Sequence, residues 1–373
     1  MIPTDDVPTI DVATLSRRLR HAETPTIVDV RPLAERAEWF IPGSLHFDAY
    51  ERLKADAPDA LDGLALAATN TVVTVCAAGR MSLRAAALLR GRGINAISLA
   101  GGMQAWSFAW NSANVPLADS VAQVIQVRRT GKGCLSYLIG HGDEALVVDP
   151  SLDPDVYLSL ARERGWHIRQ VFDTHVHADH LSRARALAQH AGATLRVPAQ
   201  DRLGYPFTPL RDGDTIAVGA ARLTALATPG HTGESMCYLL DECTLFSGDT
   251  LFLVSVGRPD LEAGAGEAQR RARLLFQSLQ RLFTLAPDTT ILPGHASQPI
   301  AFDAVPLQAP LREVRAAISL PLDDENAFAN ALLARIPATP PNYLRIVELN
   351  ERGVLPDGDL TDLEAGANRC AVS

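Results

Sequence analysis

The sequence has little of what marks secreted, membrane-spanning or nucleic-acid-binding proteins. Its five cysteines are scattered and form no Cys-x-x-Cys pair, which argues against a disulfide framework and favours a reducing cytoplasm. No apolar run approaches the ~20 residues that span a bilayer, and the first residues carry no signal-peptide pattern. Lysine and arginine form no dense block, and the net charge is -9. We therefore expect a cytoplasmic protein that binds neither nucleic acid nor membranes, with a homo-oligomer left open.

What the chain does contain is enough apolar sequence for real cores. Its 373 residues are 47% hydrophobic and 21% charged, and at ~150 residues per domain this length predicts two or three domains. The clearest break is the small, polar, proline-bearing stretch 111–122. We predict one domain over 1–118 and a second over 119–373, with a core at about 120–302 and a helical extension over 303–373.

The first domain alternates strand and helix patterns. Strands are expected at 26–30, 71–75 and 94–99, and a helix at 82–92. Continuous apolar strands separated by helices predict a parallel α/β sheet that is covered on both faces.

After the break, strand-like runs are closer together, with helices between them, which predicts a sheet-rich α/β domain. The expected strands are 134–139, 144–148, 168–173, 222–227, 236–240, 244–247 and 289–292. The expected helices are 155–164, 181–191 and 267–285. Residues 303–373 are helical and proline-punctuated, and we expect them to cover this domain rather than to fold alone.

The strongest chemical signal is the pattern His-x-His-x-Asp-His, formed by His175, His177, Asp179 and His180. It follows the apolar run 168–173, so three imidazoles and one carboxylate stand at the end of a strand. In a turning loop these side chains can converge on one point. In a continued strand His175 and His177 would share a face, and His180 would start the next helix.

Three more strand-like runs end in a glycine-containing turn followed by one ligand-type residue. These residues are His231, Asp249 and His295. Open α/β sheets place their sites beyond the carboxyl ends of strands, so we predict that all seven side chains line one metal site. A single histidine or aspartate after a strand is more often a helix cap or a surface residue than a ligand. Ligand-type residues at the ends of four separate strands together indicate a metal site. We assign no site role to the other histidines, which are His21, His46, His141, His167 and His190.

The ligand types leave the metal open. Two histidines and one carboxylate form the facial triad of non-haem Fe(II) oxygenases, whereas all seven residues could hold two zinc ions and a bridging hydroxide. The ordered set resembles the metallo-β-lactamase superfamily over roughly residues 120–300. That resemblance implies an αβ/βα sandwich, and the superfamily includes both two-zinc hydrolases and mononuclear iron dioxygenases.

Two flanking segments resemble the persulfide dioxygenase branch of that superfamily, Cys134–Leu138 and Gly257–Asp260. The resemblance implies one Fe(II) per chain, held by His175, His231 and Asp249. The outer shell, or the ligands of a second metal, would be His177, Asp179, His180 and His295.

Arg258, in the second of these segments, is our candidate for binding the acidic tail of the substrate. A guanidinium offers a planar fork to a carboxylate or a phosphate. The alternative is a structural ion pair with Asp260 across a turn.

In the first domain, the strand at 71–75 runs into Cys76, and a helix with Arg80 at its start follows. A thiol in such a turn faces backbone N–H groups and the positive end of the helix dipole, which stabilise a thiolate or a bound persulfide. We interpret Cys76 and Arg80 as catalytic, the alternative being a buried structural cysteine.

Four ordered motifs resemble the rhodanese domain over about residues 8–112. They are Asp29–Pro32 with Glu35, Ile41–Ser44, Cys76–Ser82 and Leu99–Trp106. The resemblance implies sulfur transfer through a cysteine persulfide, with sulfite or thiosulfate as the partner at this site.

The two resemblances together predict an enzyme that uses dioxygen to oxidise a low-molecular-weight thiol persulfide to sulfite and thiol, coupled to rhodanese-type sulfur transfer. The alternatives are a two-zinc thioester hydrolase of glyoxalase II type and a non-catalytic sulfane-sulfur carrier. The carrier reading implies a closed structural zinc site, which is usually four-coordinate, whereas seven candidate ligands are present.

Overall fold

The structure, a computed structural model, describes residues 4–20, 25–66 and 70–372. Residues 1–3, part of the segment on which the absence of a signal peptide was predicted, and His21, to which no role was assigned, lie outside the described residues. Within the described ranges, no helix combines the length and the apolar character needed to cross a bilayer.

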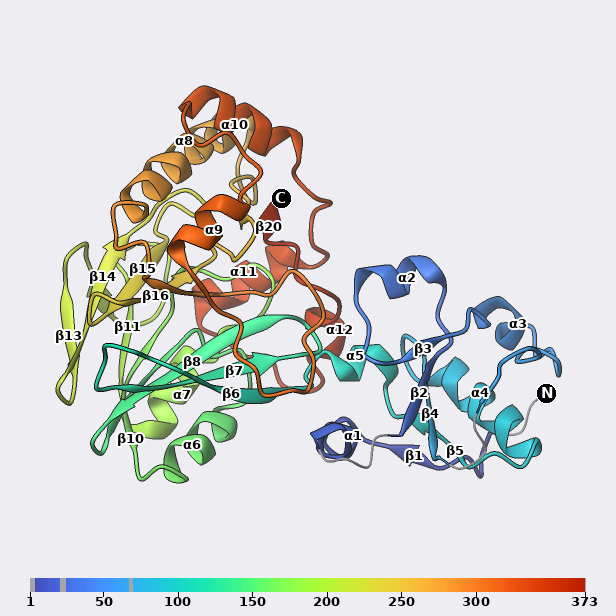
Figure 1. The fold of residues 1–373 in the computed structure, drawn as a ribbon. Coiled ribbons are helices and arrows are strands. Elements are labelled where there is room, and N and C mark those ends of the chain that lie inside the picture. Colours follow the sequence, from blue (N-terminus) through green and yellow to red (C-terminus); the bar gives the residue numbers. More distant parts are fainter. Residues whose placement is uncertain (1–3, 21–24, 67–69, 373) are drawn as a thin grey trace.

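The first domain is a parallel sheet of five strands in the order β1-β5-β4-β2-β3, with helices on both faces (Figure 1). Its strands are β1 (Thr9–Ile10), β2 (Thr26–Asp29), β3 (Leu45–His46), β4 (Val72–Val75) and β5 (Ala96–Leu99). Its helices are α1 (Val12–Arg20), α2 (Leu33–Glu38), α3 (Tyr50–Lys54), α4 (Arg80–Gly91) and α5 (Gly102–Trp106). One face packs around Leu53 and Leu89 and the other around Leu15 and Trp106, so the predicted doubly covered parallel sheet is confirmed.

The second domain contains two large sheets and one small one. The seven-stranded sheet has the order β12-β11-β10-β9-β8-β7-β6 and consists of β6 (Asn111–Val115), β7 (Gln123–Arg129), β8 (Cys134–His141), β9 (Glu144–Val148), β10 (His167–Phe172), β11 (Thr194–Pro198) and β12 (Thr208–Leu210). The six-stranded sheet has the order β13-β14-β15-β16-β18-β19 and consists of β13 (Thr215–Val218), β14 (Ala221–Ala227), β15 (Met236–Leu240), β16 (Thr244–Gly248), β18 (Thr290–Pro293) and β19 (Ala309–Pro310). The small sheet pairs β17 (Val256–Gly257) with β20 (Ala371–Val372).

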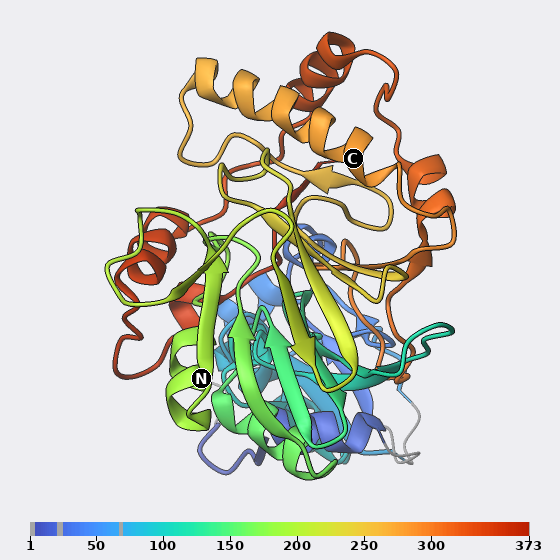
Figure 2. The ribbon, with the colours of Figure 1, turned by 90° about the vertical axis from the view of Figure 1, so that its left-hand side faces the viewer.

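These sheets face each other across one apolar core and carry helices on their outer faces. Tyr137 and Phe172 of the first sheet meet Tyr238 and Phe246 of the second in that core. The outer helices are α6 (Pro154–Arg162) and α7 (Ala184–Ala191) on the seven-stranded sheet, and α8 (Ala265–Leu282), α9 (Leu311–Ala317) and α10 (Glu325–Ala334) on the six-stranded sheet. Figure 2 shows α8 and α10 together, far from α6 and α7. The predicted αβ/βα sandwich is confirmed.

The predicted linker at 111–122 is wrong in its first half. Residues 111–115 form β6, which pairs antiparallel with β7 at the edge of the seven-stranded sheet. The small polar composition resembles a linker, but alternate side chains of β6 are buried, as a half-covered edge strand requires. The seven-stranded sheet therefore begins before residue 118.

The C-terminal extension does more than cover the second domain. Its last helices are α11 (Tyr343–Arg352) and α12 (Thr361–Glu364), and α12 lies beside α5 of the first domain (Figure 1). The domains also meet directly, since Trp39 Nε1 donates a hydrogen bond to the Thr130 carbonyl at 3.0 Å. The C-terminal segment therefore contacts the first domain as well as the second, through α12 and through the pair of Arg369 with Glu38.

Candidate metal centre

The His-x-His-x-Asp-His motif lies in the loop between β10 and α7. Helix α7 begins at Ala184, so His180 does not start the helix as one reading expected. The loop continues because His180 Nδ1 donates to its neighbour Asp179 at 2.9 Å, and Ser182 Oγ accepts the Ala184 N–H at 3.0 Å. The four motif side chains are all buried.

The other three predicted ligands arrive from strand ends of the second sheet, as their spacing predicts. His231 follows β14, Asp249 follows β16 and His295 follows β18. The structure therefore gathers all seven predicted side chains into one buried region, each at most 3% exposed. The remaining described histidines lie elsewhere, with His46 and His141 bonded to backbone groups of other segments.

Three of these side chains direct free donor atoms at one another. His175 Nε2 and His231 Nε2 lie 3.8 and 3.6 Å from Asp249 Oδ2. His175 Nδ1 donates to the Thr174 hydroxyl at 2.8 Å, and His231 Nδ1 donates to the Arg258 carbonyl at 2.7 Å. These bonds fix both tautomers with the Nε2 lone pairs facing inward.

The free donor atoms fit a metal ion. His175 Nε2 and Asp249 Oδ2 are buried and have no hydrogen-bond partner, a costly arrangement that a bound cation would relieve. Burial lowers the pKa of both His175 and His231, so both rings are neutral, as ligation requires. Burial opposes ionisation of Asp249, but the neighbouring His295 overcomes it and lowers the pKa of this carboxyl.

His295 lies outside this set of free donors. Its Nδ1 donates to Asp249 Oδ1 at 2.7 Å and its Nε2 donates to Asp179 Oδ2 at 3.0 Å. Although burial disfavours the charge, these two carboxylates raise the pKa of His295 well above its usual value. Both nitrogens therefore hold protons, and the ring acts as a cationic bridge rather than a ligand.

His177 also faces away from the triad. Its Nε2 lies 3.3 Å from Asp149 Oδ1 and 3.6 Å from Asp173 Oδ1. The two carboxylates raise the pKa of His177 against the effect of burial. In this arrangement His177 contacts Asp149 and Asp173 rather than the triad. The donor atoms that face one another belong to His175, His231 and Asp249.

A second buried group contains Cys134, for which the sequence analysis predicted no role. Cys134 Sγ lies 3.4 Å from Asp179 Oδ2 and 3.8 Å from His180 Nδ1, next to His295. Burial and Asp179 oppose the thiolate, but the positive rings of His180 and His295 prevail and lower the pKa of Cys134 to about 6. This group is the place where a second metal would have to bind, after His295 gives up a hydrogen bond.

Cys370 was also missed, because it comes from the far end of the chain. Strand β20 brings its sulfur within 4.8 Å of donor atoms of Asp249 and His295. Burial raises the pKa of this thiol well above its usual value. Cys134 was at least inside a segment that resembled a family motif, whereas no local pattern marks Cys370.

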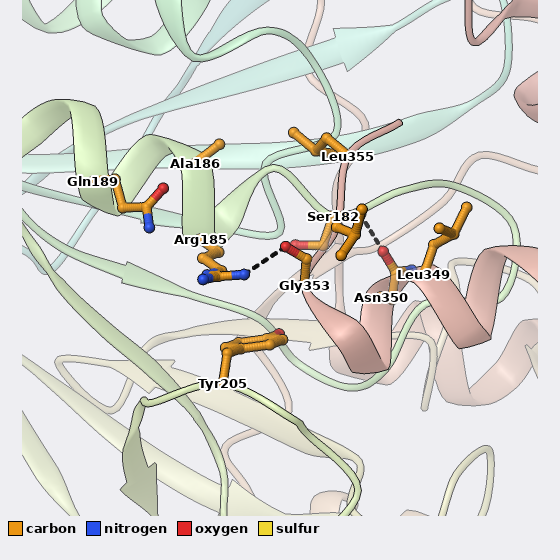
Figure 3. Close-up of a pocket in the computed structure, with 10 residues that line it drawn as sticks. Ser182, Arg185, Ala186, Gln189, Tyr205, Leu349, Asn350, Gly353 and Leu355 are labelled. Atoms are coloured by element: carbon orange, nitrogen blue, oxygen red, sulfur yellow. Dashed lines mark hydrogen bonds between the residues drawn. The ribbon is translucent and has the colours of Figure 1, made fainter. Parts of the chain in front are cut away.

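Asn350 of α11 clamps the ligand loop from the outside (Figure 3). Its Nδ2 donates to the carbonyls of His177 and His180 at 2.8 and 2.9 Å. Its Oδ1 accepts the Ser182 N–H at 2.9 Å, a bond that is drawn in Figure 3. One buried amide thus satisfies three backbone groups of the loop that carries the ligands.

Replacing Asn350 with alanine is expected to loosen this loop and weaken metal binding by about 10- to 100-fold, the usual effect of losing an outer support. Metal affinity measured by competition with a chelator checks this. Asn326→Ala, on the exposed side of α10 where Asn326 accepts a bond from Arg273, is the matched control. Equal affinities for both variants would contradict the clamp.

Arg258 does not take the role first assigned to it. Its fully buried guanidinium pairs with both oxygens of Asp260 at 2.8 Å and donates to the carbonyls of Pro337, Ala338 and Arg369. These contacts support the alternative interpretation, in which Arg258 forms a structural ion pair with Asp260. It ties the C-terminal extension to the turn after Asp249, and its donors are already used.

In the first domain, Cys76 lies between β4 and α4 as expected. Its Sγ accepts the Gly79 N–H at 3.2 Å and lies 3.4 Å from Ser82 Oγ. Gly79 has a φ of 90°, which turns this N–H toward the sulfur. Arg80 is exposed at the start of α4. This cradle can stabilise a thiolate or a persulfide.

A pocket of about 160 Å³ adjoins the Cys76 loop at the junction of the two domains. Trp39, Ala77 and Gln104 of the first domain line it, together with Gly131 and residues 365–367 of the second. The C-terminal segment that carries Cys370 to the metal centre therefore also forms a wall beside the Cys76 loop.

Comparison with known proteins finds two families along the chain. Residues 129–295 match the Metallo-beta-lactamase superfamily, and residues 11–109 match the Rhodanese-like domain. A hydroxyacylglutathione hydrolase of Cereibacter sphaeroides is 35% identical over 159 residues, covering 42% of this chain and 58% of that protein. A hydroxyacylglutathione hydrolase of Nitrosococcus oceani is 33% identical over 208 residues, covering 54% and 70%. This chain thus spans little more than half of the first of these relatives.

Two solved structures are similar to this chain over about three fifths of its length. A metallo-beta-lactamase from Staphylococcus aureus is 31% identical with a TM-score of 0.57, covering 63% of this chain and 74% of that chain. ETHE1 from Myxococcus xanthus is 29% identical with a TM-score of 0.54, covering 61% of this chain and 96% of that chain.

Proposed function

Since the chain belongs to the metallo-beta-lactamase superfamily and carries a rhodanese-like domain ahead of it, we propose that it is an iron-dependent persulfide dioxygenase coupled to sulfur transfer. The observation that carries this proposal is the split among the seven candidate ligands. Two neutral imidazoles and one carboxylate have free donor atoms that face one another, whereas both nitrogens of His295 are hydrogen-bonded. The nitrogens of His177 and His180 Nε2 are also without hydrogen-bond partners, but these two rings are grouped with Asp149 and with Asp179 rather than with the triad. Two imidazoles and one carboxylate are the donor set of a facial triad with open positions.

Fe(II) held by His175, His231 and Asp249 would supply redox chemistry and open positions for a persulfide sulfur and dioxygen. The chain's own residues set the geometry. His295 holds Asp249 Oδ1, so that Oδ2 points at the two imidazoles. Thr174 and the Arg258 carbonyl hold the rings, and the burial of all three ligands excludes water.

At the first domain, sulfur transfer needs no oxidant. A persulfide on Cys76 passes its outer sulfur to sulfite, the S–S bond to Cys76 breaks, and thiosulfate and the Cys76 thiolate form. Gly79 N–H and the start of α4 stabilise the thiolate that leaves. The proposed substrates and products of the two domains therefore match, since the sulfite formed at one site is the acceptor at the other.

A two-zinc thioester hydrolase is the second candidate, and the hydroxyacylglutathione hydrolases among the relatives favour it. The site would need local rearrangement for this. His177 would leave Asp149 to join the first zinc, and His295 would give up one of its two bonds to join Asp179 and His180 at the second.

Metal content and oxygen uptake together test the proposal. We expect protein purified without oxygen to hold about one iron per chain and to consume dioxygen and release sulfite when a thiol persulfide is added. Cys76→Ser should keep oxygen uptake but accumulate sulfite in place of thiosulfate, whereas Cys243→Ser, at a half-buried thiol outside both sites, should resemble the parent. Two zinc ions per chain with thioester hydrolysis and no oxygen uptake would establish the hydrolase instead.

A further inference from the structure

A largely apolar pocket of about 280 Å³ lies against His295 of the metal centre. Leu253 and Val254, which follow Asp249 closely in the sequence, line it together with Ile300 and Leu307. Because His295 is bonded to Asp249, the pocket lies one residue away from a predicted metal ligand. If a substrate approached the triad past His295, its sulfur would lie near the triad and the rest of its thiol arm would lie in this pocket.

The charged side chains that line this pocket neutralise one another. The Arg128 guanidinium is 1% exposed and donates to Asn111 Oδ1 at 2.8 Å, to Asp303 Oδ1 at 3.2 Å and to the Ala301 and Val305 carbonyls. His295 is already bridged between two carboxylates. Among the described residues of the lining, these are the groups that can carry a positive charge. Four of the five Arg128 N–H donors and both His295 nitrogens are already hydrogen-bonded within the protein, and both side chains are at most 3% exposed.

Arg258 offers no replacement, because its guanidinium is fully buried and paired with Asp260. A carboxylate placed in this pocket would lose its hydration without gaining a partner, which is costly. An uncharged arm would instead gain from burying apolar surface against Leu253, Ile300 and Leu307.

We propose that this pocket binds the thiol arm of the substrate and selects an uncharged, largely apolar arm over one that carries carboxylates. The inference rests on the proposed function for the identity of the reacting sulfur, but the selectivity itself belongs to the pocket. It names the substrate class by chemistry: a thiol whose arm consists of alkyl and amide groups and carries no carboxylate.

Unreactive thioethers measure this selectivity without turnover. We expect S-methyl pantetheine, which is uncharged, to bind at least about 10-fold more tightly than S-methyl glutathione in calorimetry, a difference of about 1.4 kcal/mol. Val254 is 50% exposed at the rim, so Val254→Arg can add a free cation there without disturbing the core. This variant should tighten glutathione binding several-fold, whereas Val254→Met, which adds length without charge, should not.

Tighter or equal binding of S-methyl glutathione to the parent protein would overturn the proposal, as would an unchanged preference in Val254→Arg. Coenzyme A carries the same arm as pantetheine with a nucleotide attached. If S-methyl coenzyme A binds more tightly than S-methyl pantetheine, the natural substrate carries that nucleotide. If S-methyl pantetheine binds as expected but no persulfide supports oxygen uptake, the dioxygenase function fails and this inference stands.

Discussion

Replacing Asp249 with asparagine is expected to abolish stable metal binding and to lower persulfide-dependent oxygen uptake by more than about 100-fold. Loss of an outer support typically costs 10- to 100-fold, and Asp249 is a predicted ligand itself. Its two oxygens have separate tasks: Oδ1 accepts the His295 N–H at 2.7 Å, and Oδ2 faces His175 and His231. An asparagine keeps one oxygen and no charge, so it cannot perform both.

Metal analysis after dialysis, together with oxygen uptake, measures this effect, and thermal unfolding shows whether the variant still folds. Asp212→Asn is the matched control, since Asp212 is a half-exposed carboxylate paired with Arg281 on the surface of the same domain. Full metal content and full activity in Asp249→Asn would remove Asp249 from the ligand set.

The parts of the site that could be predicted from sequence are those with a local signal. An apolar run followed by a glycine-containing turn and a ligand-type residue marks the end of a strand, and His231, Asp249 and His295 each follow such a run. The two halves of the fold were predictable for the same reason, because their strands are continuous apolar runs separated by helical patterns.

The supports of the site could not be predicted, because they come from distant parts of the chain. Asn350 and Cys370 stand in the C-terminal extension, more than a hundred residues from the ligand loop and from Asp249 respectively. Their positions depend on how α11 and β20 fold back over the second domain. Arg258 was misassigned for a related reason: its partners at 337, 338 and 369 cannot be read from its neighbours in sequence.

The edge strand β6 shows that amino-acid composition alone does not distinguish a linker from an edge strand. Asn111 to Val115 has the polar, small residues of a linker, and its strand character comes from hydrogen bonds to β7 and from alternate burial. Strand propensity reflects fit to a half-buried surface as much as the backbone itself. Composition alone therefore gave no sign that residues 111–115 join the seven-stranded sheet.

The buried carboxylate that holds the C-terminal extension in place is Glu364. Its two oxygens accept bonds from Arg129 at 2.6 Å and Arg183 at 2.7 Å, and Lys132 Nζ donates to its carbonyl at 3.0 Å. Glu364 and Arg129 are both fully buried. Burial opposes the charge on Glu364, but Arg129 and Arg183 prevail and lower the pKa of its carboxyl to about 2.

Glu364→Gln is expected to lower the free energy of unfolding of the second domain by about 3–5 kcal/mol, because it leaves two buried guanidinium groups without their anion. Urea unfolding followed by circular dichroism measures the change. Glu348→Gln is the control, since Glu348 pairs with Arg345 and Arg352 on an exposed helix face, where such pairs contribute less than about 1 kcal/mol. Equal destabilisation by the two variants would contradict a structural role for the buried charge.

The pH dependence of this destabilisation follows from the sign of the pKa shift. Glu364 has a lower pKa in the folded protein than its usual value of 4.5, so below that value the unfolded chain binds the proton first and acid favours unfolding. The charge therefore contributes its full stability above about pH 4.5, and this contribution is lost as the pH falls toward 2. The difference between the parent and Glu364→Gln should accordingly be constant near neutrality and shrink with acidification. A difference that grew as the pH fell would mean that Glu364 is protonated in the folded protein, and the C-terminal extension would then have to be anchored to both domains by other contacts.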